Sequence, residues 1–311
     1  MKISGFRTVL LAGTLTSASA QVSVEVTLDQ QQFLEGESLP AAVRVTNRSG
    51  QTLHLGDEAE WLTFSVESKD GQVVSKLGEV PVAGEFTLDS SKVAIKRVNL
   101  APYFTLTHRG RYAIVASVHV KDWAQDMTSP PKSFDIIEGA KMWEQEVGVP
   151  QSSGSGAPEV RKYILQQANY IKGQLRLYLR VTDAYGRAIR VLPIGPMVSF
   201  GHPEPPQIDN LSNLHVLYQT GPFSFSYTVF NPDGELVTRQ VYEFSGNTRP
   251  RLSATDDGAV VIKGGTRRIT PNDVPAPKDD DEDTSPTTPT TPVSESVTKT
   301  APPDTAPSKP K

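Results

Sequence analysis

Residues 175–181, Leu-Arg-Leu-Tyr-Leu-Arg-Val, decide the fold of this chain, because apolar and polar side chains alternate through them without a break. Successive side chains of a β-strand point to opposite faces, so a period of two predicts a strand that buries one face. Residues 223–229 repeat the pattern, and the turn sequence Asn-Pro-Asp-Gly follows at residues 231–234. Residues 158–269 are therefore predicted to form a hairpin-rich β-domain, either a sandwich or a small open barrel.

The N-terminal half of the chain shows the same alternation at residues 22–28 and 112–120, between frequent turn sequences. About seven short strands and no convincing helix are predicted for residues 21–138, an arrangement typical of a β-sandwich. The predicted fold class is all-β, with two tandem β-sandwich domains followed by a disordered C-terminal tail.

Two segments differ from this strand pattern. Residues 139–157 are predicted to be a linker, because serine and glycine dominate their second part. Met142, Trp143 and Val147 are expected to dock from this linker onto a domain surface. Residues 270–311 are rich in threonine and proline and cannot bury enough apolar area to offset the entropy lost on ordering. They are predicted to be a disordered tail.

The first 20 residues have the pattern of a cleaved signal peptide. Lys2 and Arg7 precede a short apolar run, and Ala18-Ser19-Ala20 supplies the small residues that a signal peptidase recognises. The apolar run is too short to span a bilayer, so the chain is predicted to be secreted or periplasmic and not membrane-spanning. The sequence contains no cysteine, which excludes a lipidated cysteine after the signal peptide and a thiol nucleophile.

The sequence offers little that points to catalysis. None of the histidines has a second ligand at metal-binding spacing, and no nucleophile motif stands in a strand–turn–helix context. The acidic run at residues 279–283 lacks the alternating ligands of a calcium loop. We therefore expect no enzyme, no metal and no cofactor, and each histidine is expected to be exposed or half-buried. The five histidines are His54, His108, His119, His202 and His215.

One hairpin carries a candidate ligand-binding face. Four side chains of this hairpin are expected to share its outer face, as an aromatic and basic patch that binds an anionic polysaccharide or an acidic partner protein. The alternative is ordinary pairing with local carboxylates, because the outer face of an antiparallel sheet is commonly polar. The net charge of −4 gives no global field that favours nucleic acid. The four residues are Arg176, Tyr178, Arg180 and Arg190.

Residues 193–209 are predicted to form a long loop stiffened by several prolines. Met197 and Phe200 are expected to be exposed on it or tucked beneath it. Long loops on β-scaffolds often carry recognition, but a crossover between two sheets needs a similar length. Both interpretations remain open.

A resemblance to a known family rests on two stretches of the N-terminal half. Residues 33–47, with Glu-Gly-Glu and a closing Val-Thr-Asn, and residues 100–112, which end in Gly-Arg-Tyr, resemble bacterial immunoglobulin-like domains. The BsuPI-type domains, which are similar to intracellular proteinase inhibitors, and adhesion-type modules are the nearest groups. The resemblance implies an immunoglobulin-like sandwich, in which the Tyr112 hydroxyl bonds back to the preceding loop as in a tyrosine corner.

These observations favour an exported, non-catalytic binding or structural module of the bacterial envelope or of a secreted assembly. Its partner is expected to be an envelope protein or polysaccharide. The resemblance implies an alternative, an exported proteinase inhibitor or chaperone-like protein. A carbohydrate-active enzyme is a third class and requires a cleft with paired carboxylates. The identity of the partner and the oligomeric state are open.

Overall fold

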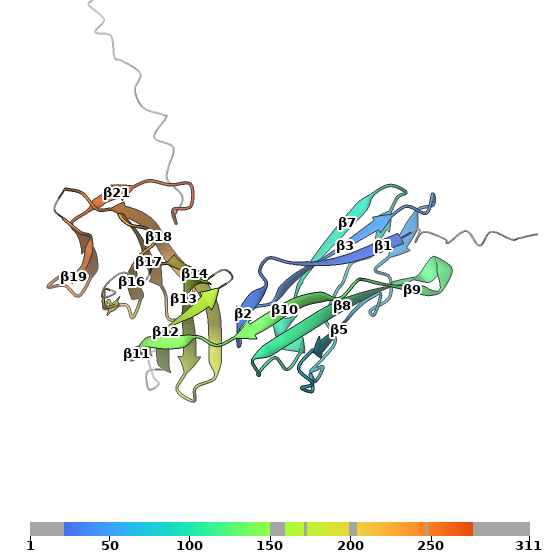
Figure 1. Cartoon of the computed structure of the whole chain (residues 1–311), viewed down its shortest axis with the longest axis horizontal. Helices are drawn as coiled ribbons and strands as arrows, with labels where there is room; N and C mark the ends of the chain where they lie inside the picture. The colour runs from blue at the N-terminus through green and yellow to red at the C-terminus, as the bar shows by residue number, and fades with distance from the viewer. Residues whose placement is uncertain (1–21, 150–158, 171–172, 199–203, 247, 276–311) are drawn as a thin grey trace, which may run out of the picture. The chain divides into compact units, whose positions relative to one another are not determined.

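The computed structural model describes residues 22–149, 159–170, 173–198, 204–246 and 248–275 (Figure 1). The described residues form strands and two short 3-10 turns, with no α-helix among them. No helix in these ranges is long and apolar enough to cross a membrane. The predicted all-β fold is confirmed. The predicted signal peptide, residues 1–20, lies outside the described residues.

The N-terminal half is a sandwich of two sheets, with strand orders β1-β3-β7 and β2-β10-β8-β5, and β9 pairs with β8. A small two-stranded sheet, β4-β6, completes it, and the two 3-10 turns η1 and η2 flank β8. The element bounds are β1 Val22–Leu28, β2 Gln32–Leu34, β3 Pro40–Asn47, β4 Leu53–Leu55, β5 Leu62–Ser68, β6 Phe86–Leu88, β7 Val93–Asn99, η1 Ala101–Tyr103, β8 Gly110–Val120, η2 Lys121–Trp123, β9 Gln125–Thr128 and β10 Lys132–Ile137.

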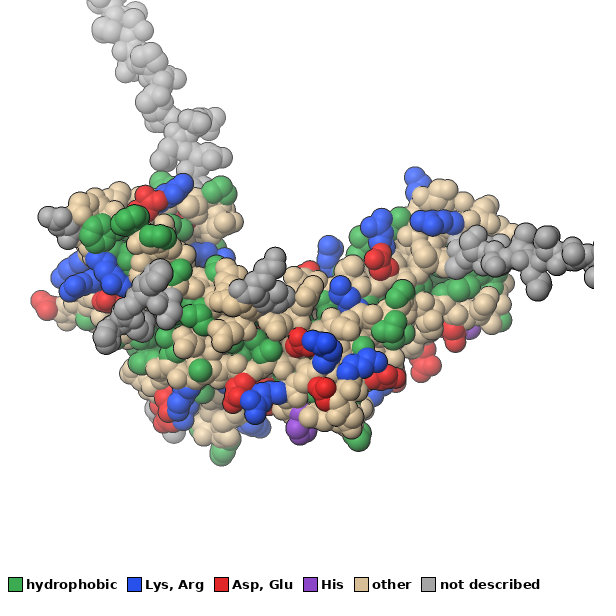
Figure 2. Space-filling model, in the orientation of Figure 1, with side chains coloured by type: hydrophobic (Ala, Val, Ile, Leu, Met, Phe, Trp, Pro, Cys, Tyr) green, Lys and Arg blue, Asp and Glu red, His purple; other side chains and the backbone are tan. Residues whose placement is uncertain are grey.

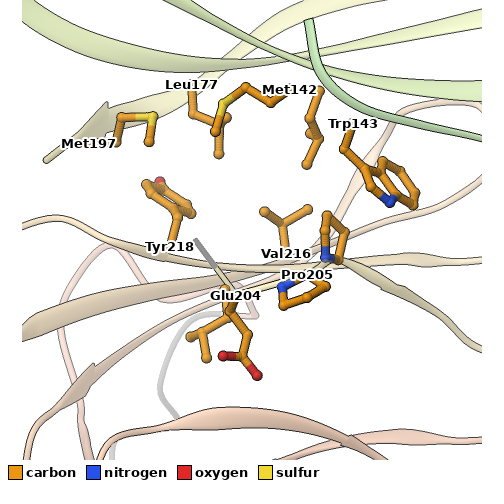
Figure 3. Close-up of a pocket in the computed structure, with 11 residues that line it drawn as sticks. Met142, Trp143, Leu177, Met197, Glu204, Pro205, Val216 and Tyr218 are labelled. Atoms are coloured by element: carbon orange, nitrogen blue, oxygen red, sulfur yellow. The ribbon is translucent and has the colours of Figure 1, made fainter. Parts of the chain in front are cut away.

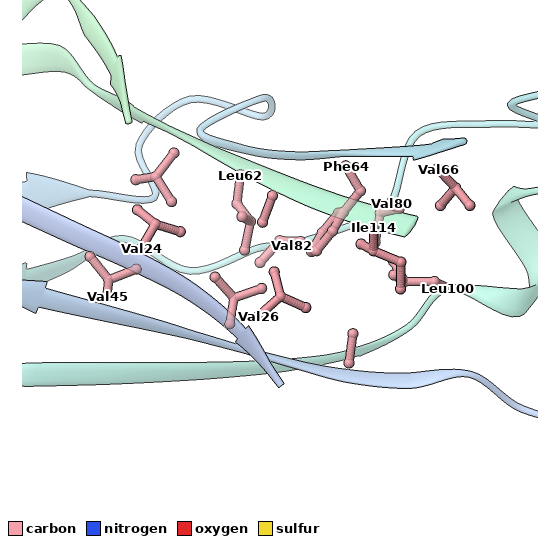
Figure 4. Close-up of a cluster of buried hydrophobic side chains, with 14 of the residues drawn as sticks. Val24, Val26, Val45, Leu62, Phe64, Val66, Val80, Val82, Leu100 and Ile114 are labelled. Carbon is pink, nitrogen blue, oxygen red and sulfur yellow. The ribbon is translucent and has the colours of Figure 1, made fainter. Parts of the chain in front are cut away.

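The core of this sandwich follows from the alternation in the sequence. Every second residue of β1 is buried, and the residues between them are exposed. Val24 and Val26 of β1 lie among the buried side chains of the same core as Phe64 of β5 and Ile114 of β8 (Figure 4). Burial of each such side chain stabilises the fold by roughly 1.5–3 kcal/mol, so the regular alternation favours face-to-face packing of the two sheets.

The first two strands of this half belong to different sheets. β1 runs antiparallel to β3, whereas β2 runs parallel to β10.

Tyr112, near the start of β8, is buried, and its hydroxyl donates a hydrogen bond of 2.7 Å to the backbone carbonyl of His108. The bond that the resemblance implied is therefore present.

The C-terminal half consists of two antiparallel sheets and one additional hairpin. The sheet orders are β11-β12-β13-β14 and β15-β16-β17-β18-β21, and β19 pairs with β20. One core joins the two sheets, and a smaller one lies between β16–β17 and the β19–β20 hairpin. The strand bounds are β11 Ala140–Val149, β12 Glu159–Tyr170, β13 Gln174–Asp183, β14 Ala188–Met197, β15 Gln207–Ile208, β16 Leu214–Gln219, β17 Ser224–Phe230, β18 Leu236–Glu243, β19 Arg251–Ala254, β20 Val260–Lys263 and β21 Thr266–Arg268.

The predicted linker at residues 139–157 differs from the structure in its first part, because Ala140–Val149 is strand β11. This strand lies at the edge of its sheet, and none of its residues is fully buried, so the alternation of buried and exposed residues that marks a strand is absent. Met142, Trp143 and Val147 pack partly buried against the core, as expected of docking residues. Residues 150–157 lie outside the described residues.

The predicted tail also begins later than expected. The backbones of Val274 and Arg239 exchange two hydrogen bonds of 2.9 Å, and Asp273 is buried. Residues 270–275 therefore belong to the folded C-terminal half. The rest of the predicted tail, residues 276–311, lies outside the described residues.

Candidate functional site

An apolar pocket of about 220 Å³ lies between the two sheets of the C-terminal half (Figure 3). One wall comes from β11, β12, β13 and β14, and the opposite wall comes from β16 and the segment that precedes β15. The lining is almost entirely carbon and sulfur. The lining residues are Met142, Trp143, Leu165, Leu177, Met197, Glu204, Pro205, Pro206, Val216, Leu217 and Tyr218.

A β-bulge in β11 builds one side of the pocket. Consecutive residues of a regular strand point to opposite faces, yet Met142 and Trp143 both line the pocket. The pairing register of β11 with β12 shifts between Lys141 and Trp143, which leaves Met142 without an opposite residue. Such an extra residue re-aims the neighbouring side chains, so two large apolar groups reach the same space.

Tyr218 fits into the opposite wall because residue 195 is glycine. A Cβ atom at Gly195 would lie 2.6 Å from the Tyr218 hydroxyl oxygen, closer than such atoms approach. The hydroxyl donates a long hydrogen bond of 3.4 Å to the carbonyl of Ile194, and burial raises its pKa. The absent side chain thus lets a tyrosine ring line the pocket.

Of the described residues that line the pocket, one is charged: Glu204, in the segment before β15. Its carboxylate points away from the apolar side chains that line the cavity (Figure 3). Tyr218 supplies the single hydroxyl of the lining. The arrangement can enclose an apolar group, and it places a negative charge beside it.

A second feature of the C-terminal half is a set of three hydrogen-bonded polar side chains, Asp209, His215 and Tyr227. His215 Nε2 lies 3.0 Å from Asp209 Oδ2, and Nδ1 lies 2.7 Å from the Tyr227 hydroxyl. Because an ionised carboxylate can only accept, Nε2 carries the hydrogen and Nδ1 accepts from the tyrosine. His215 is 6% exposed, unlike the exposed or half-buried histidine that was predicted.

Burial and hydrogen bonding shift the pKa values of Tyr227 and Asp209. Burial raises the pKa of Tyr227 to about 12, so the phenol keeps its proton at neutral pH. Burial also acts to raise the pKa of Asp209, but hydrogen bonds from His215 and Asn213 outweigh it and hold the value below the usual one. No group of three or more potential metal ligands occurs among the residues that the structure describes.

The sequence-predicted face around Arg176 is placed differently from the expectation. Tyr178 is fully buried in a cluster with Leu34, Ala168 and Val191. Arg176 Nη1 donates a hydrogen bond of 2.8 Å to the side-chain oxygen of Gln30. The polar face of β13 is therefore largely covered by residues of the N-terminal half, which the pattern of one strand cannot reveal.

Arg180 and Arg190 lie on opposite faces of the same hairpin. Arg180 Nη2 donates a hydrogen bond of 2.6 Å to the backbone carbonyl of Glu35. Arg190 pairs with Val181, the next residue along β13, so its side chain points to the other side. It is exposed and lies 3.8 Å from Glu235. The structure brings Arg176, Tyr178 and Arg180 together but not Arg190.

A buried carboxyl lies close to Arg176. Glu37 is 5% exposed and accepts hydrogen bonds from the Leu34 backbone, at 2.8 Å, and from the Gln30 side chain. Burial raises the pKa of Glu37 to about 7, although these hydrogen bonds and the charge of Arg176 act in the opposite direction. No sequence pattern predicts this buried carboxyl, because Glu37 lies in a segment with the composition of a polar turn.

A different surface presents exposed basic side chains. Arg251 of β19 and Lys263 of β20 lie opposite each other and are exposed. Figure 2 shows basic side chains gathered over β19. Neither residue forms an ion pair with a carboxylate of the described part of the chain. No sequence pattern predicts this pair, because each residue is a single basic position in its strand and only the register of the hairpin places the two opposite each other.

The predicted loop at residues 193–209 is partly strand. β14 extends to Met197, whose side chain lines the pocket, and β15 begins at Gln207. Pro205 and Pro206 line the pocket from the segment between them. Phe200 lies outside the described residues. The region singled out for recognition therefore contributes directly to the pocket.

Comparison with known proteins gives no family. No protein-family model and no curated protein matches the chain. The crystal structure of Spo0M, a sporulation control protein from Bacillus subtilis, matches 56% of this chain and 89% of its own at 9% sequence identity. Its TM-score of 0.29 is too low to carry an argument about fold or function.

Proposed function

We propose that the chain is an exported, non-catalytic binding module of the bacterial envelope or of a secreted assembly, and that the apolar pocket is its binding site. The observation that carries this proposal is the pocket volume of about 220 Å³ with its apolar lining. Apolar cavities of about 150 Å³ stay dry and bind benzene. A larger pocket of the same chemistry offers a favourable place for an apolar group of a ligand.

The chemistry of the surrounding groups favours binding over catalysis. Of the lining residues, only Glu204 and Tyr218 carry polar side-chain groups besides the indole of Trp143. The set of Asp209, His215 and Tyr227 is enclosed, and its phenol is held protonated by burial. These groups suit a rigid binding scaffold, whereas a hydrolase needs an activated nucleophile or a pair of accessible carboxylates.

The export part of the proposal rests on the N-terminal sequence. A basic start, a short apolar run and Ala18-Ser19-Ala20 are typical of a cleaved signal peptide. A binding domain stabilised by its cores alone, without disulfides, is compatible with the periplasm or the medium. The mature chain would begin at Gln21.

Methionine methyl groups allow a direct test of the pocket. The chain has four methionines, of which Met142 and Met197 line the pocket and Met127 lies in β9 of the other half. We would follow their ¹³C-methyl NMR signals while titrating indole and n-hexanol. The proposal expects Met142 and Met197 to shift and Met127 to stay unchanged.

A filled pocket provides the control. Leu177→Trp places a ring into the space and should abolish the shifts, whereas Val73→Trp adds the same ring at a position that is 86% exposed and should not. Val216→Phe, at the opposite wall, gives the same test if Leu177→Trp fails to fold. Absence of shifts with both probes would overturn the proposed site.

A second candidate function, proteinase inhibition, is favoured by one loop of the N-terminal half. Val73 and Leu77 are 86% and 65% exposed on the segment between β5 and β6. Hydrogen bonds from Leu77 N to Tyr103 O, at 2.8 Å, and from Thr105 N to Ser75 O, at 2.9 Å, hold this segment in place. An accessible and anchored loop is what an inhibitor needs to present.

The immunoglobulin-like identity of this half belongs to the same proposal. It is supported by the parallel pairing of β2 with β10 and by the hydrogen bond of Tyr112 to His108. The test is stoichiometric inhibition of serine, cysteine and metalloproteinases, with loss of inhibition in Leu77→Asp. If no proteinase is inhibited, this second function is wrong, and the pocket proposal is unaffected.

A further inference from the structure

We infer that the ligand of the pocket is a small aromatic ring system that carries a positively charged group. This inference rests on the proposed binding function of the pocket and specifies the class of ligand. It combines three observations: the side chains that line the walls, the sign of the charge beside them, and the volume.

The walls favour a ring over an aliphatic chain. Met142 and Met197 lie along one wall with their sulfur atoms, and the rings of Trp143 and Tyr218 border the same space (Figure 3). Thioether sulfur makes favourable contacts with ring edges, and aromatic pairs add to the free energy gained from burial alone. An alkyl chain gains only the burial.

The charge beside the pocket favours a cation. Among the lining residues that the structure describes, Glu204 is the one charged residue, and none is a lysine, arginine or histidine. Lys141, next to the bulge, is held by Glu144 at 2.9 Å. A ligand with a carboxylate would therefore meet a like charge without a partner, whereas an amine would be attracted.

The volume limits the size of the ligand. At about 220 Å³, the pocket is smaller than the roughly 300–1,000 Å³ of sites for drug-sized molecules. It has room for one or two fused rings, and a sterol or a full acyl chain would extend far outside it. A small free molecule that combines an aromatic ring with a cationic amino group meets all three conditions.

Three small probes of similar size separate these conditions: tryptamine, indole-3-propionate and n-octylamine. Their affinities would be measured with the ¹³C-methyl signals of Met142 and Met197. Ring contacts should make tryptamine bind about three- to tenfold more tightly than n-octylamine. The charge of the half-buried Glu204 should make tryptamine bind about threefold more tightly than indole-3-propionate.

Glu204→Gln isolates the charge. In this variant, tryptamine and indole-3-propionate should bind with equal affinity, while uncharged indole binds as it does to the unchanged chain. Glu243→Gln, on β18 and outside the pocket lining, is the matched control and should leave the difference between the two probes in place.

Each part of the inference has its own contrary result. Equal affinity for n-octylamine and tryptamine would overturn the ring, and equal affinity for the two indoles in the unchanged chain would overturn the cation. A Lys-Trp-Lys peptide tests whether the ring and the cation belong to a protein partner. If this peptide shifts the methyl signals and tryptamine does not, the ligand is not a free small molecule. If indole and n-hexanol also fail to bind, the proposed function itself is wrong.

Discussion

The hydroxyl oxygen of Tyr218 occupies the space next to Gly195, where a Cβ atom would approach it to 2.6 Å. Because this contact joins β14 to β16, it sets how closely the two sheets approach beside the pocket. The shape of the binding site thus depends on the absence of one side chain.

Gly195→Ala should destabilise the C-terminal half. Inserting a methyl group into a packed site costs typically about 1–3 kcal/mol, which thermal unfolding would detect as a lower melting temperature. Tyr218→Phe in the same chain removes the atom that clashes and should restore much of the loss. Gly221→Ala is the control, since its Cβ would meet no atom closer than 3.7 Å. Equal effects of the two alanine substitutions would contradict this account.

Glu37→Gln should change how stability depends on pH. The folded chain keeps a proton on Glu37 up to a pKa of about 7, whereas the unfolded chain releases it near 4.5. The stability from this group is therefore fully present below about pH 4.5 and is lost as the pH rises through 7. Relative to Glu37→Gln, the unchanged chain should lose up to about 3 kcal/mol of unfolding free energy above pH 7. Parallel pH profiles in chemical denaturation would refute this.

His215→Gln should destabilise the chain more than His119→Gln. His215 is buried between Asp209 and Tyr227, and its loss leaves buried polar groups without partners, at a cost of about 1–3 kcal/mol. His119 lies 2.7 Å from Asp126, but both side chains contact solvent, so this pair contributes at most about 1 kcal/mol. Urea unfolding of both variants measures the difference, and a larger loss in His119→Gln would be the opposite result.

Export can be tested by mass spectrometry of the chain produced in a bacterial host. Cleavage after Ala20 should yield a mature chain that begins at Gln21 in the periplasmic or medium fraction. Ala18→Arg and Ala20→Arg introduce large charged residues at the recognised positions and should leave the precursor uncut. A full-length chain in the cytosol would be incompatible with export.

The sequence predicted the strands well where one face is buried. Residues 22–28 alternate both in the sequence and in burial, with Leu28 half-buried at the end. Residues 175–181 alternate in the sequence but less regularly in burial, because Leu175 is half-buried like Arg176 and Tyr178 is fully buried. Strand β11 was missed as a strand, because an edge position and a bulge break the alternation on which the prediction depends. The alternation of apolar and polar residues thus identifies strands with one buried face and does not identify edge strands that lack such a face.

The site itself could not be predicted from local pattern. The pocket collects residues from five strands and one connecting segment, and no stretch of sequence contains more than a few of them. The pairing of His215 with Asp209 spans a turn between two strands, so it has no fixed spacing by which to find it. Tyr178 shows the converse case, a residue on a polar face that another part of the chain covers.

The thioethers of Met142 and Met197, which both line the pocket, make it sensitive to oxidants. Peroxide converts methionine to its sulfoxide, which is polar and has a different shape. An oxygen atom on Met142 or Met197 would add a polar group to a wall of carbon and sulfur atoms. Water would then compete with the apolar group of a ligand for this space. Treatment with methionine sulfoxide reductases would reverse the change, so the affinity of this protein for its ligand would depend on whether the two methionines have been oxidised.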